Sequence, residues 1–147
     1  MYLIKNEDQK RKTIKLIEEF KKKLSRIRQR EGTEAAKLFS EAYRARVEEL
    51  RRQVRVFETI RGHGLAPSEF SKPDEFGQYL VKARIASRKT QGQLARELQV
   101  SQPMIYKYEA AQYMNAGLDV LLRVAEILGV SVTITAALAR GSLSKSL

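Results

Sequence analysis

The sequence predicts a mainly α-helical protein, with a long helical hairpin first, a compact group of short helices next, and one short β-strand near the C-terminus. Three observations support this. Apolar residues recur every three or four positions over residues 6–30 and 33–60, two short helical segments follow one another over residues 90–109, and β-branched residues alternate with others over residues 130–138. Helices repeat every 3.6 residues and strands every two, so the spacing separates the two structures.

The first half of the chain favours two long amphipathic helices. Asn6, with Gln9 three positions later, is suited to begin the first helix, and Thr33 follows Gly32 as a cap for the second. Each helix has one apolar stripe that needs another surface, so we expect the two to pack as an antiparallel hairpin. The near-heptad spacing of the second stripe also suits a second copy or a partner protein. The stripes contain Leu16 or Ile17, Phe20, Leu24 and Ile27, then Phe39, Tyr43, Val47, Leu50, Val54 and Phe57.

Glycine, proline and serine concentrate over residues 61–73, which is typical of a linker. The predicted organisation is therefore a helical hairpin over residues 1–62, a linker over 63–73, a helical domain over 74–130, and a strand with a tail over 131–147. The hairpin is expected to serve dimerisation or partner binding.

Residues 90–109 predict two short helices joined by a tight turn. Thr90 and Gln93 have the spacing of a capping box, and Ser101 is suited to cap the second helix, with Pro103 in its first turn, where proline is tolerated. Leu94, Ala95 and Leu98 share one face of the first helix, while Ile105 and Tyr108 are the inward positions of the second. This arrangement is a helix-turn-helix.

The motif resembles that of the Xre family of phage-repressor-like transcriptional regulators. The resemblance covers residues 74–130 and implies a five-helix domain that binds double-stranded operator DNA. It also implies that Arg84 and Glu109 form a structural ion pair and do not read DNA. The matching residues are Thr90, Gln91, Leu94, Ala95, Ile105, Tyr108 and Glu109.

Four exposed positions of the second helix are the candidate DNA readers. Gln102 can donate to and accept from one adenine edge, and Met104 can contact a thymine methyl group. Tyr106 and Lys107 are placed to reach further bases or phosphates. Pro103 stands where phage repressors often carry a polar reader, so it offers only apolar contact. The backbone contacts are expected from Gln91, Ser101, Arg88 and Lys89.

Residues 130–138, VSVTITAAL, favour a short strand because β-branched residues alternate there. The sequence contains no second strand candidate, so we expect pairing with the same strand of a second copy in a homodimer. A further turn of helix or a frayed tail is the alternative.

The composition narrows the classes of function. The net charge is +11, and residues 1–62 hold 18 Lys or Arg against 10 Asp or Glu, which suits a polyanionic partner or simply a solvated helix face. There is no cysteine and only one histidine, so no metal site or cofactor is expected. No catalytic set is visible, and the apolar runs are short. We therefore expect a cytoplasmic protein that is not an enzyme and does not enter a membrane.

The opening residues, YLIKNEDQ, followed by two long helices ahead of the helix-turn-helix, resemble the layout of HigA-type antitoxins. The resulting hypothesis is a homodimeric repressor that is the antitoxin and autorepressor of a toxin-antitoxin operon, with a toxin bound by the N-terminal hairpin. The alternative is a stand-alone repressor, phage-like or housekeeping, with no toxin partner.

Overall fold

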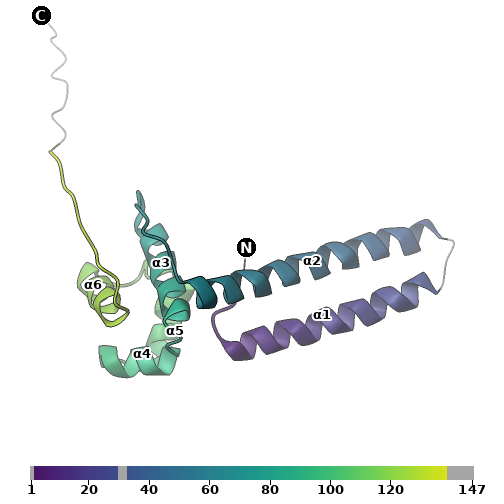
Figure 1. Cartoon of the computed structure of the whole chain (residues 1–147), viewed down its shortest axis with the longest axis horizontal. Coiled ribbons are helices and arrows are strands. Elements are labelled where there is room, and N and C mark those ends of the chain that lie inside the picture. Colours follow the sequence, from purple (N-terminus) through teal and green to yellow (C-terminus); the bar gives the residue numbers. More distant parts are fainter. Residues whose placement is uncertain (1, 30–32, 139–147) are drawn as a thin grey trace, which may run out of the picture.

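Six helices form the part of the chain that the computed structural model describes, residues 2–29 and 33–138. A long hairpin of two helices projects from a cluster of four shorter ones (Figure 1). The helices are α1 (Glu7–Arg28), α2 (Glu34–His63), α3 (Pro73–Ala86), α4 (Gln91–Leu98), α5 (Gln102–Ala110) and α6 (Leu118–Ile127). The prediction of a mainly helical protein is confirmed.

The hairpin begins where the sequence places its caps. The Asn6 side chain accepts a hydrogen bond from the Gln9 amide at the start of α1, and that of Thr33 accepts one from the Ala36 amide at the start of α2. In the middle of the hairpin, α1 and α2 pack together through the buried residues Ile17, Val47 and Leu50, with further half-buried apolar residues around them. None of the helices in the described ranges combines the length and apolar character needed to cross a membrane.

The four short helices share one core with the base of the hairpin. Leu80 of α3, Leu94 of α4 and Ile105 of α5 are fully buried in this core. Ile4, which precedes α1, and Phe57, near the end of α2, are buried in the same cluster. The residues before and after the predicted linker therefore share one hydrophobic core.

The prediction of a five-helix domain over residues 74–130 is wrong, because this range contains only α3 to α6. Between α5 and α6 the chain forms turns, and Gln112 and Tyr113 there have positive φ angles of 52° and 59°, which a helix does not contain. Apolar surface on the four helices is covered by Ile4, Phe57 and Ile60 from the other half of the chain.

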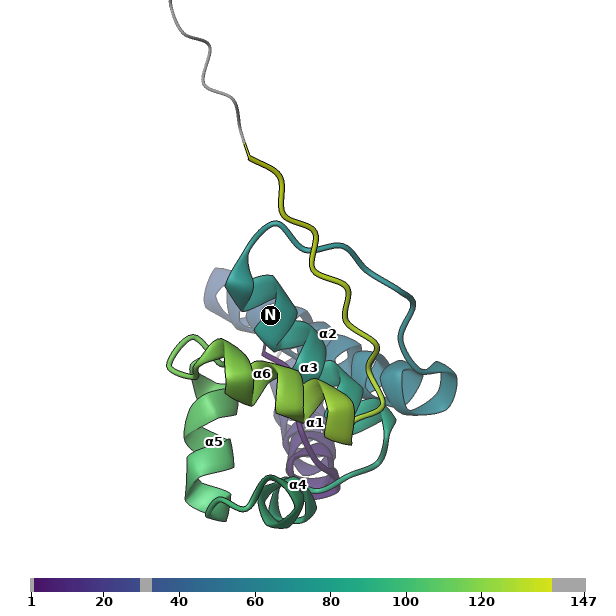
Figure 2. The same cartoon turned by 90° about the vertical axis from the view of Figure 1, so that its left-hand side faces the viewer.

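The predicted strand over residues 130–138 is not supported in the described chain. Residues 130–138 leave the end of α6 with no strand structure, as Figure 2 shows. Val130 and Val132 pack against the core, whereas Ile134 is exposed. A strand requires hydrogen bonds to a neighbouring strand, and the described chain supplies none. The expected pairing across a dimer has no support here, and the tail from residue 139 lies outside the described residues.

Among the described glycines, Gly77 of α3 lies closest to backbone of another segment. A Cβ atom there would lie 1.8 Å from the Gln112 carbonyl oxygen. Alanine normally favours a helix over glycine by about 1 kcal/mol. Here the contacting atom belongs to backbone and cannot move aside, so we expect Gly77→Ala to lower the free energy of unfolding by about 1–3 kcal/mol, measured by urea denaturation.

Gly62→Ala is the matched control. Gly62 is also helical, and a Cβ atom there meets nothing within 4 Å. That variant is expected to be neutral or slightly stabilising. Equal effects of the two substitutions would contradict the tight packing of α3 against the turn after α5.

Candidate nucleic-acid interface

Helices α4 and α5 are joined by a turn whose geometry is fixed by local hydrogen bonds. The Thr90 amide donates to Gln93 Oε1 over 2.8 Å, and the Gln93 amide donates to Thr90 Oγ1 over 3.1 Å, which completes the predicted capping box. Gln99 ends α4 in the left-handed conformation, with φ 61°. Ser101 then caps α5, because its Oγ accepts from the Met104 amide. The chain therefore changes direction between α4 and α5 within three residues.

The inner faces of α4 and α5 are buried, which fixes the outer face of α5 toward solvent. Leu94, Ala95 and Leu98 are at most 2% exposed, and Ile105 is fully buried. This anchoring is what makes α5 a rigid element, since its exposed side chains move with a packed helix and not with a loop. The exposed residues of α5 and its cap are Ser101, Gln102, Pro103, Met104, Tyr106 and Lys107.

A buried ion pair ties α3 to the end of α5. Arg84 and Glu109 are each 2% exposed, and both Arg84 Nε and Nη2 donate to the Glu109 carboxylate. Arg84 Nη1 also donates to the Lys89 carbonyl oxygen over 2.9 Å. The pair lies inside the protein, so neither residue is available to contact a ligand.

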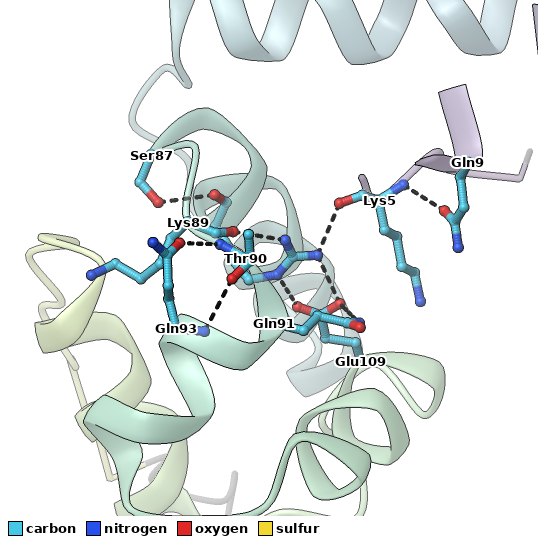
Figure 3. Close-up of polar contacts among 9 residues, drawn as sticks. Lys5, Gln9, Ser87, Lys89, Thr90, Gln91, Gln93 and Glu109 are labelled. Atoms are coloured by element: carbon cyan, nitrogen blue, oxygen red, sulfur yellow. Dashed lines mark hydrogen bonds and ion pairs between the residues drawn. The ribbon is translucent and has the colours of Figure 1, made fainter. Parts of the chain in front are cut away.

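Two further residues complete this network, as Figure 3 shows. Gln91 Nε2 donates to Glu109 Oε2 over 2.7 Å, and the Lys5 carbonyl oxygen accepts from Arg84 Nη2 over 3.1 Å. An amide NH₂ has two hydrogens, so Gln91 keeps one donor beyond its bond to Glu109. The predicted backbone contact of Gln91 is therefore compatible with its role in the network.

The two basic residues before α4 differ in their surroundings. Arg88 is exposed, has a positive φ of 57°, and forms no ion pair with any described residue. Lys89 is half-buried, and its Nζ lies 2.5 Å from Glu97 Oε1. Part of the Lys89 charge is thus offset within the protein, whereas Arg88 keeps its full charge toward solvent.

Gln102 lies against the start of α4. A Cβ atom at Gly92 would be 3.3 Å from Gln102 Oε1, so the glutamine side chain crosses the first turn of α4 above this glycine. The absence of a side chain at Gly92 leaves space for the Gln102 amide.

Tyr113, in the turn after α5, packs against Tyr108 of that helix. The ring is 2% exposed and stacks on Tyr108 with 5.8 Å between the ring centroids. Burial raises the pKa of Tyr113, and the nearby Glu109 carboxylate raises it further. The phenol therefore stays neutral at ordinary pH, and its hydroxyl has no hydrogen-bond partner among the described residues.

Three residues that shape this region were not identified from the sequence: Ile4, Lys5 and Gly77. Ile4 and Lys5 come from a segment that the sequence assigned only to the hairpin, and Gly77 was not distinguished from other helical residues. The apolar pair Leu3–Ile4 directly before the Asn6 cap was the available signal for the first two. Among the residues that the structure describes, no group of His, Cys, Asp or Glu is arranged to hold a metal ion.

Comparison with known proteins agrees with this geometry. A family model described as a helix-turn-helix matches residues 80–134, which include α4, the turn and α5. No curated protein and no solved structure matches the chain. The match supports the Xre-type resemblance of this segment and gives no support to the HigA-type resemblance. Residues 80–134 are therefore a helix-turn-helix domain, a type of domain that binds DNA.

Proposed function

We propose that the protein is a sequence-specific transcriptional repressor that binds operator DNA with the exposed face of α5. One observation carries the proposal: a helix anchored by a buried ion pair presents Gln102, Met104, Tyr106 and Lys107 to solvent. A protein α-helix fits the major groove of B-form DNA, where each base pair presents a distinct pattern of donors and acceptors. Occupying an operator in this way would block transcription.

Gln102 is the proposed base reader. We expect Gln102→Ala to weaken binding by roughly 1–3 kcal/mol on duplexes enriched from a random library, and to have little effect on duplexes of scrambled sequence. Fluorescence anisotropy with both kinds of duplex measures the difference.

Gln29→Ala is the matched control for this test, because Gln29 lies at the far end of α1 and is exposed. Its binding should equal that of the unmodified protein. Equal losses on enriched and scrambled duplexes for Gln102→Ala would remove the base-reading role.

We also propose that two copies bind DNA as a homodimer through the outer face of α6. Leu118 and Leu122 are 58% and 37% exposed and lie one turn apart on this face. Asp119 and Arg123 flank them, and neither forms an ion pair with a described residue. In an antiparallel contact between two α6 helices, each Asp119 would face Arg123 of the other copy, so the face is complementary to itself.

A charge exchange tests this contact. Asp119→Arg should yield monomers in light scattering after size exclusion, because it places like charges opposite each other. The double substitution Asp119→Arg with Arg123→Asp should restore the dimer. A purely monomeric unmodified protein, or a dimer that survives Asp119→Arg, would contradict the proposed interface.

A second candidate function, that of an antitoxin, draws support from the tip of the hairpin. Leu38 and Phe39 of α2 are 67% and 57% exposed. The facing end of α1 carries cations that form no ion pair with described residues: Lys22, Lys23, Arg26 and Arg28. A partner for this surface would be an acidic protein with an apolar recess, which is the chemistry proposed for the toxin.

The antitoxin proposal is tested by co-expression with the products of adjacent reading frames. A toxin should slow growth when expressed alone, and the unmodified protein should relieve this effect and co-purify with the toxin. The double substitution Leu38→Ser with Phe39→Ser should lose both properties while retaining DNA binding. Without a growth-inhibiting neighbour, the protein would be a stand-alone repressor.

A further inference from the structure

The segment before α1 is held firmly against the helix-turn-helix domain. Ile4 is fully buried in the shared core, and the Lys5 amide donates to Gln9 Oε1 over 2.8 Å. The Lys5 carbonyl oxygen accepts from the buried Arg84. These contacts use the backbone of Lys5, and its ammonium group forms no hydrogen bond or ion pair with a described residue. The position of Lys5 is therefore set by the same ion pair that positions α5.

Lys5 lies near residues expected to contact the DNA backbone. It is one of the residues that line an open cavity of about 310 Å³, together with Arg88, Lys89 and Thr90. In Figure 3 the Lys5 side chain forms no hydrogen bond to the other residues drawn. Lys5 therefore lines the same cavity as the residues at the start of α4, where the proposed phosphate contacts begin.

The charges around this cavity leave a positive surplus. Its walls carry five basic residues and two acidic ones, and three of the basic residues are paired: Arg61 with Glu7, Arg84 with Glu109, and Lys89 with Glu97. Both acidic residues are already paired: Glu7 with Arg61, and Asp8 with Lys12 at 2.7 Å. The Lys12 hydrogen bond lowers the pKa of Asp8, so this carboxylate remains charged and engaged with its own helix. Among the described residues, neither Lys5 nor Arg88 forms an ion pair.

We infer that Lys5 contacts a phosphate of bound double-stranded DNA, so that the segment before α1 extends the contact made by the helix-turn-helix domain. The inference rests on the proposed DNA-binding function. A lysine is a compact point charge, well suited to a phosphate oxygen and unable to read sequence by itself. The contact would therefore strengthen binding to all duplexes and would place the base of the hairpin against the DNA backbone.

The salt dependence of binding tests this contact without knowledge of the operator. A fluorescein-labelled duplex of scrambled sequence is titrated at several salt concentrations. Each phosphate neutralised by a cation contributes about 0.9 to the slope of log affinity against log salt. We expect Lys5→Gln to reduce the slope by about 0.9 for each bound copy, and Lys5→Arg to retain the full slope.

Lys15→Gln is the matched control, because Lys15 is an exposed lysine of α1 that does not line the cavity. Its slope should be unchanged, and thermal unfolding should show that Lys5→Gln remains folded. An unchanged slope for Lys5→Gln, while Arg88→Gln reduces it, would overturn the inference and leave the DNA-binding function intact. No binding of any duplex by the unmodified protein would overturn both.

Discussion

The buried Arg84–Glu109 ion pair is the interaction on which the rest of the structure depends. Removing a guanidinium and a carboxylate from water is costly unless each finds its partner in good geometry. Here the pair is satisfied from several directions, because Gln91 donates to Glu109 while the carbonyl groups of Lys89 and Lys5 accept from Arg84. One buried charge pair therefore fixes α3, α4, α5 and the segment before α1 in a single arrangement.

This arrangement connects the two halves of the protein physically. The hairpin is joined to the helix-turn-helix domain by packing as well as by the linker, since Ile4 and Phe57 lie in the same core as Leu80 and Leu94. The length of the hairpin places its exposed tip far from α5 (Figure 1), so one protein can present two separate surfaces.

The local signals in the sequence were reliable where the structure is local. The Thr90–Gln93 capping box, the Ser101 cap and the Asn6 and Thr33 caps form at the predicted residues, because each depends only on neighbours three positions away. The five-helix domain was expected from the family resemblance and not from local spacing, and the C-terminal strand depended on a partner strand that the described chain does not supply. Their covering surfaces and hydrogen-bond partners cannot be read from spacing alone.

By itself, the sequence determined the helices, their caps and the identity of the residues on the outer face of α5. It also supplied Arg84 and Glu109 through the resemblance of the motif. Only the tertiary structure decided that Gln91 and the Lys5 carbonyl join this pair, and that Ile4 completes the core. The reason is physical: caps and amphipathic faces follow from positions a few residues apart, whereas the Lys5–Arg84 contact joins positions that only packing brings together.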